Sequence, residues 1–125
     1  MKRHALALVL AAALAPLPLA AQAHAHGKGK NGGQLADAGS YHVEAVAKGE
    51  TLTVYLTDHD TDKPIATTGF KGLAILVAGG KTQRIQLAPA GQNELTGRAD
   101  AALAAPIKGA IQITNARNST VLAKF

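Results

Sequence analysis

The sequence predicts an all-β protein: an antiparallel Ig-like β-sandwich of about seven to eight short strands, preceded by an N-terminal signal peptide. Short runs alternate between apolar and polar residues, which is the spacing of half-buried strands. All 13 glycines lie after residue 26, mostly at the breaks between these runs. No segment with helical periodicity is long enough to cover a parallel sheet. These observations together favour the all-β class.

The first 25 residues have the organisation of a secretory signal peptide. The first three are a positively charged start, residues 5–14 are an unbroken apolar run, and prolines follow that run. A membrane-spanning helix needs about 20 apolar residues, and the prolines interrupt this run earlier. Cleavage after Ala23 or Ala25 fits the small-x-small rule. We therefore expect a Sec-type export to the periplasm, removal of residues 1–25, and no membrane insertion after cleavage.

The mature chain divides into a flexible Gly/Lys/His lead-in, residues 26–33, and a single β-sandwich domain, residues 34–125. Residues 34–38 and 65–68 are the weaker strand candidates, and the Ala-rich residues 99–105 are compatible with one helical turn. The stronger strand candidates are residues 41–47, 51–57, 73–78, 81–88, 94–98, 110–115 and 120–125.

Burial fixes the register of one predicted strand pair. The two strands on either side of Gly49 pair antiparallel, with partner numbers that add up to 98 or to 99. Only 99 places Val54 opposite Ala45, with both on the apolar face. The same register places His42 on the solvent face, and His59 shares that face if the strand continues. The two histidines are then diagonal neighbours, roughly 7–8 Å apart at the backbone.

The new N-terminus is the first candidate metal site. Cleavage after Ala23 leaves His24-Ala25-His26 with a free amine. An amine, two backbone amides and an imidazole provide four nitrogens in a plane, which suits Cu(II) or Ni(II). Cleavage after Ala25 leaves His26 first, and its amine and imidazole can chelate one copper ion. The alternative is a tail whose histidines are only solvated.

His42 and His59 form the second candidate metal site, with Glu44 or the N-terminal tail as a further ligand; the alternative is two exposed polar residues. The Asp-rich residues 58–62 hint at a calcium loop. Gly69, however, stands where an EF-hand needs a bidentate Glu. We therefore interpret the Asp-rich segment as a β-turn in which Asp caps its own backbone.

Composition excludes several function classes. The chain has no Cys, which excludes a disulfide framework, a thiolate metal site and a Cys nucleophile. It has two Tyr, two Phe and no Trp, and its formal charge falls from +5 to +3 when Lys2 and Arg3 leave with the signal. We therefore expect no nucleic-acid partner. Ser40, His42 and Asp58 are near one another in the predicted hairpin, but no nucleophile elbow accompanies them, so we expect no enzyme.

Five motifs resemble those of small exported bacterial proteins similar to the N-terminal β-sandwich of periplasmic adaptor subunits of heavy-metal efflux pumps. They are Asn31-Gly32-Gly33-Gln34, Tyr41-His42-Val43-Glu44, residues 54–60, residues 87–90 and residues 93–97. The resemblance covers roughly residues 31–125 and implies a free-standing domain with a metal-efflux component as its partner. Asn31 stands where the adaptor domains often have His, and the chain lacks their helical hairpin and barrel domains. A looser likeness is to small periplasmic copper carriers whose mature chains begin with His.

The histidines and the resemblance together predict a periplasmic protein that binds or buffers a divalent metal. Cu(II) is the first expectation, with Ni(II) and Zn(II) after it. The alternative is a metal-free periplasmic protein–protein interaction or structural module that uses a sheet face or an edge strand.

Overall fold

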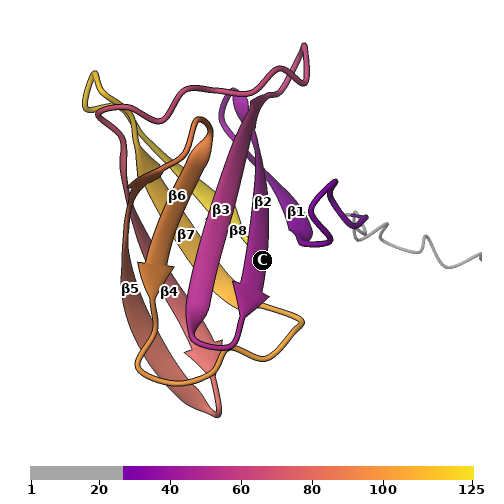
Figure 1. Cartoon of the computed structure of the whole chain (residues 1–125), viewed down its shortest axis with the longest axis vertical. Coiled ribbons are helices and arrows are strands. Elements are labelled where there is room, and N and C mark those ends of the chain that lie inside the picture. Colours follow the sequence, from indigo (N-terminus) through magenta and orange to yellow (C-terminus); the bar gives the residue numbers. More distant parts are fainter. Residues whose placement is uncertain (1–26) are drawn as a thin grey trace, which may run out of the picture.

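The computed structural model describes residues 27–125, so the predicted signal peptide, His24 and His26 lie outside the described residues. Within this range no helix is of a length and apolarity to cross a bilayer. The described chain forms eight strands (Figure 1): β1 (Gln34–Ala38), β2 (Tyr41–Lys48), β3 (Thr51–Asp58), β4 (Lys71–Ala78), β5 (Lys81–Ala90), β6 (Glu94–Arg98), β7 (Lys108–Thr114) and β8 (Thr120–Lys124).

The strands are hydrogen-bonded in one continuous order, β1-β2-β3-β6-β5-β4-β7-β8, and every pairing is antiparallel. β5 joins the two halves, since its first part pairs with β4 and its last residues, Ala88–Ala90, pair with β6. The outer strands β1 and β8 come into contact, and Val121 packs against Gly39 in the β1–β2 turn. The sheet is therefore nearly closed and barrel-like, with β2, β3 and β6 in front of β7 and β8 in Figure 1.

The structure confirms the all-β antiparallel class and the number of strands. The narrower prediction of an Ig-like sandwich stays a prediction, since the described strands form one continuous sheet. Two weaker expectations are wrong. Residues 65–68 form no strand, because Pro64 has no N–H to donate and the amides after it bond to separate segments. Residues 99–105 form no helical turn, because the amides of Ala99 and Leu103 donate to carbonyls in the β2–β3 turn.

The interior is filled by aliphatic side chains from alternate positions of the strands. The largest fully buried ones are Val43, Leu52, Val54, Leu56, Leu76, Ile85, Leu95, Ile111 and Ile113. The predicted β2–β3 register is confirmed, since Val54 pairs with Ala45 and His42 pairs with Thr57. The aliphatic side chains of this pair therefore point inward, and His42 points outward.

Adjacent residues of β4 test the assignment of the two faces. Leu76 is 1% exposed and Val77 is 51% exposed. Because a buried leucine leaves a cavity, we expect Leu76→Ala to lower the free energy of unfolding by about 2–5 kcal/mol. The matched change Val77→Ala is expected to cost less than about 1 kcal/mol. Urea denaturation measures both, and losses of equal size would contradict the assigned faces.

Candidate metal centre

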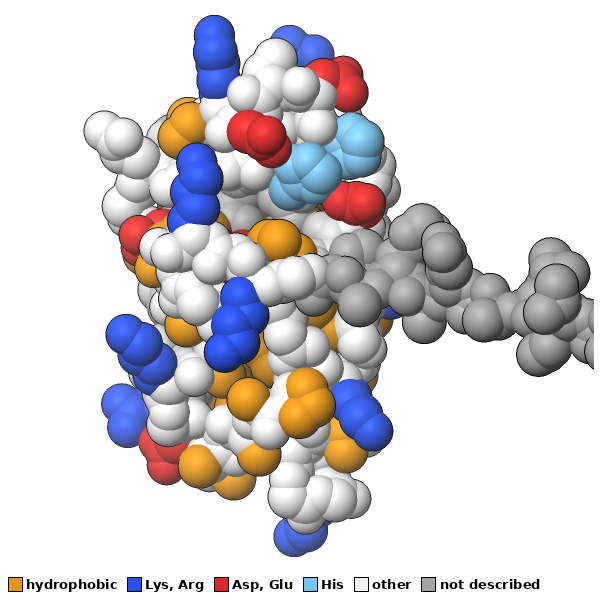
Figure 2. All heavy atoms as spheres, turned by 90° about the vertical axis from the view of Figure 1, so that its right-hand side faces the viewer, with side chains coloured by type: hydrophobic (Ala, Val, Ile, Leu, Met, Phe, Trp, Pro, Cys, Tyr) orange, Lys and Arg blue, Asp and Glu red, His pale blue; other side chains and the backbone are white. Residues whose placement is uncertain are grey.

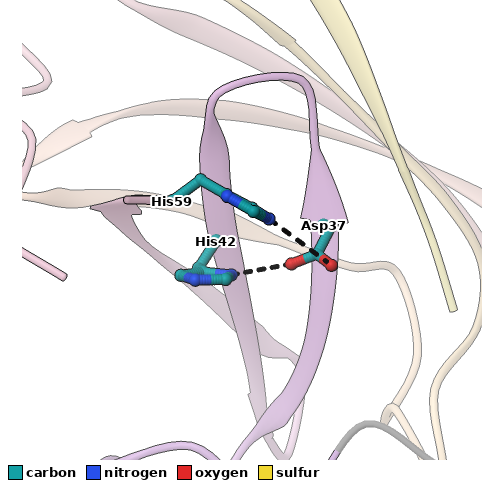
Figure 3. Close-up of side chains that lie close together, drawn as sticks. All are labelled: Asp37, His42 and His59. Atoms are coloured by element: carbon teal, nitrogen blue, oxygen red, sulfur yellow. Dashed lines mark hydrogen bonds and ion pairs between the residues drawn. The ribbon is translucent and has the colours of Figure 1, made fainter. Parts of the chain in front are cut away.

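Asp37, His42 and His59 meet at one edge of the β1–β2–β3 sheet (Figure 3). Asp37 comes from β1 and pairs directly with His42 of β2, while His59 follows the last residue of β3. One ligand atom from each of the three residues lies within 4.8 Å of the other two. Figure 2 shows the two imidazoles side by side on the surface, with carboxylates around them.

The turn after β3 positions His59. Asp58 Oδ1 accepts hydrogen bonds from the backbone N–H of Asp60 and of Thr61, both at 2.9 Å, and from Thr61 Oγ1 at 3.1 Å. The N–H of His59 donates to the carbonyl of Ser40 at 2.9 Å, which ties this turn to the β1–β2 turn. The predicted Asp-rich turn is therefore confirmed, and it brings the His59 ring back over β2.

The Asp37 carboxylate contacts both imidazoles from one side (Figure 3). Its Oδ1 is 2.7 Å from His42 Nδ1, and its Oδ2 is 4.0 Å from His59 Nε2. The two rings stack with their centroids 4.5 Å apart and their planes inclined by 29°. On the outer side, Asp62 Oδ1 is 3.5 Å from His42 Nε2, and Asp60 Oδ1 is 3.4 Å from His59 Nδ1. Each imidazole is therefore flanked by two carboxylates.

The distances are compatible with one ion bound by all three side chains. Imidazole nitrogen and carboxylate oxygen bind Zn(II) at about 2.0–2.2 Å, which puts tetrahedral ligand atoms about 3.3–3.6 Å from one another. The Asp37 contacts with His42 and His59, at 2.7 and 4.0 Å, bracket that separation. The two stacked rings must also turn so that one nitrogen of each points toward the same ion. The side chains of His42 and His59 are 32% and 46% exposed, so an ion can enter from solvent.

Glu44 lies outside this cluster, although it shares the outer face of β2 with His42. Its side chain is buried and accepts hydrogen bonds from the N–H of Asn31 at 2.7 Å, from Asn31 Nδ2 at 3.0 Å and from the N–H of Gly33 at 3.0 Å. Gly29 packs so closely that a Cβ there would lie 2.2 Å from the Glu44 carboxyl carbon. Glu44 therefore binds the lead-in, and the structure does not place it as a metal ligand.

Asp37 and Asp62 are the members of the site that sequence reasoning missed. Asp37 lies in the weaker strand candidate, for which no register was derived; the alternation rule that placed His42 would also have placed Asp37 opposite it. Asp62 adopts a φ of 57° in the turn after β3. The alternation of apolar and polar residues along a strand does not predict such a turn conformation. His24 and His26 lie outside the described residues.

Comparison of the chain with known protein families, with curated proteins and with solved structures finds no match. The functional interpretation therefore depends on the geometry of the cluster and on the motifs of the sequence.

The turn that holds His59 is expected to weaken in acid. The backbone N–H groups of Thr61 and Asp60 lower the pKa of Asp58, because they donate to its ionised carboxylate. A carboxyl whose pKa falls on folding stabilises the fold above its unfolded pKa of about 3.9. That contribution is lost as the pH falls through the lower pKa of the folded state.

Asp58→Asn keeps an acceptor oxygen but cannot ionise. We therefore expect the variant to be less stable than the parent protein at neutral pH, and the difference to disappear in acid well below about pH 4. Urea denaturation at both pH values measures this difference, with the exposed Asp100→Asn as the control. A difference of the same size at both pH values would contradict the assigned role of Asp58.

Proposed function

We propose that this is a periplasmic protein that binds or buffers a divalent metal ion, copper first, as part of metal efflux or homeostasis. The site is the cluster formed by Asp37, His42 and His59. One observation carries the proposal: a carboxylate and two imidazoles from three separate segments offer ligand atoms within 4.8 Å of one another. The pairing of β1 with β2 and the turn after β3 bring the three side chains together on the surface.

The donor set favours Cu(II) over other common ions. Imidazole nitrogen suits Cu(II), Ni(II) and Zn(II), and among these the affinity order puts Cu(II) first. Ca(II) and Mg(II) prefer sites made of oxygen ligands alone. The chain has no Cys, and its single Met is residue 1, so the soft sulfur ligands that select Cu(I) are not provided by the mature chain.

The exposure of the site supports exchange rather than permanent binding. Both imidazoles are partly exposed, whereas structural metal sites are closed by a full set of protein ligands. Three protein ligands leave at least one position for water or for a donor from another protein. We propose such transfer to a component of a metal-efflux system, which is the partner that the adaptor resemblance implies. In this proposal the fold is a variant of the adaptor's Ig-like sandwich in which β1 and β8 come together.

The N-terminal histidines are proposed as further ligands. His42 and Lys28 line the same hollow, which has a volume of about 390 Å³. The beginning of the described chain therefore lies on the side of the molecule that holds the cluster. His26 precedes Lys28 by two residues, and a fully extended residue spans at most about 3.6 Å. We therefore propose that the tail and the cluster share one site.

Calorimetric titration of the secreted, naturally processed protein with Cu(II), Ni(II) and Zn(II) tests the proposal. We expect one equivalent of Cu(II) to bind most tightly. Because two of the ligands are lost, His42→Ala/His59→Ala is expected to weaken binding by at least about tenfold, the smallest loss typical of changes around a metal site. Asp37→Ala should weaken it in the same direction.

The matched variant is His24→Ala/His26→Ala, with its cleavage site checked by mass spectrometry. Loss of Cu(II) binding in this variant alone would move the site to the tail and contradict the cluster. Binding no tighter than that of a generic surface histidine would contradict metal handling and favour a metal-free interaction module.

The metal affinity is expected to depend on pH. Imidazole must be unprotonated to bind a metal, and histidine gains its proton at about pH 6–7. We therefore expect Cu(II) affinity to fall steeply below about pH 6. Titrations from acid to neutral pH measure this, and an affinity that does not change over that range would contradict imidazole ligation.

A further inference from the structure

The outer face of β4, β5, β7 and β8, called here the basic face, has a charge of one sign. These four strands contain five basic residues and no acidic residue: Lys71, Lys81, Arg84, Lys108 and Lys124. Residues 63–93 contain four basic residues, and residues 101–125 contain three. Neither range contains an acidic residue. These strands therefore have no carboxylate, whereas basic residues such as Lys30, Lys48 and Arg98 also occur in the other half.

All the acidic residues lie in or next to the other four strands, β1, β2, β3 and β6. They are Asp37, Glu44, Glu50, Asp58, Asp60, Asp62, Glu94 and Asp100. This half also contains the metal-site cluster. The protein therefore has an electric dipole. A negatively charged surface will orient it with the basic face toward that surface.

Exposed aliphatic side chains occupy the middle of the basic face. Ile75, Val77 and Leu122 are 39%, 51% and 48% exposed, and they are the exposed large hydrophobic residues that the described chain shows. They project from β4 and β8, on the side opposite the buried Leu76. One row across the sheet runs Arg84, Ile75, Ala110 and Lys124, so that Ile75 has a cation on either side. Val77 pairs with Lys108.

A hollow of about 380 Å³ lies on the same face. Its lining includes two cations, Lys71 and Arg84, and the side-chain amides of Gln86 and Gln112. Guanidinium, ammonium and amide groups all donate hydrogen bonds, and phosphate oxygens accept them. The hollow therefore has the chemistry to hold an anionic phosphate group.

We propose that the basic face is a peripheral binding surface for a bilayer rich in anionic lipid. This face offers cations and exposed aliphatic groups and no carboxylate over four strands. A uniformly negative plane with apolar chains beneath it matches that combination. Ile75, Val77 and Leu122 would contact the headgroup region, no segment would cross the bilayer, and the metal-site cluster would stay on the other half.

Co-sedimentation of the secreted protein with phosphatidylcholine vesicles, prepared with and without phosphatidylglycerol, tests this proposal. We expect binding only to the vesicles that contain phosphatidylglycerol, and we expect it to weaken strongly between about 10 mM and 150 mM salt, because salt screens exposed charges. Chelator should leave the binding unchanged, so failure here is separate from failure of the metal proposal. Absence of binding to anionic vesicles at low salt would overturn it.

Two variants with the same charge separate the basic face from net charge alone. Arg84→Gln/Lys124→Gln removes two cations from the face, and each is worth about fivefold in partitioning, so binding should fall by at least about tenfold. The control Lys30→Gln/Lys48→Gln removes two exposed cations from the other half and should change binding by less than about twofold. Equal losses in the two variants would overturn the proposal.

Ile75→Ser/Val77→Ser tests the aliphatic part of the face. This variant keeps every charge, and we expect it to lower the binding that remains at about 150 mM salt, where electrostatic attraction is largely screened. Unchanged binding would overturn the part assigned to the aliphatic residues. Self-association without vesicles that disappears in Arg84→Gln/Lys124→Gln would assign the face to a second copy of the chain and overturn the lipid proposal.

Discussion

The antiparallel pairing of β2 with β3 is the constraint on which the geometry of the site depends. Burial of Val54 opposite Ala45 selects one register, and a slip by one residue would expose the aliphatic side chains of the pair. The same register fixes His42 on the outer face. The β1–β2 hairpin then brings Asp37 opposite it, and the turn after β3 returns His59. The core therefore holds the three side chains close together, and in the proposed function this lowers the cost of binding an ion.

The two halves of the sheet have different electrostatic characters, and we propose a separate role for each. Carboxylates flank both imidazoles and raise the local concentration of cations around the cluster. The basic face repels cations and lies on β4, β5, β7 and β8, in the other half of the sheet. A protein adsorbed through that face would expose the acidic half to the surrounding solution, where metal ions and protein partners can reach it.

Sequence patterns predicted the strands and turns, which depend on residues close together in the chain. Alternation located the strong strands to within about two residues, and turn chemistry located the hairpins and the Asp-rich turn. The β3–β6 and β4–β7 pairings were beyond prediction, because strands distant in the chain choose partners by packing of the whole core. Glu44 shows the same limit: its alternation placed it outward, but the lead-in covers it through Asn31. Asp62 belongs to the site only because its turn folds toward β2.

The most direct test of the central claim is to observe the imidazole nitrogens of His42 and His59 during a metal titration. Long-range ¹H–¹⁵N NMR of the processed protein, with Zn(II) as a diamagnetic probe, reports each ring separately. If the two rings and Asp37 hold one ion, the ring-nitrogen signals of both histidines will change together and saturate at one equivalent. Signals that change at different metal concentrations, or that remain unchanged while the N-terminal histidines respond, would contradict the shared site.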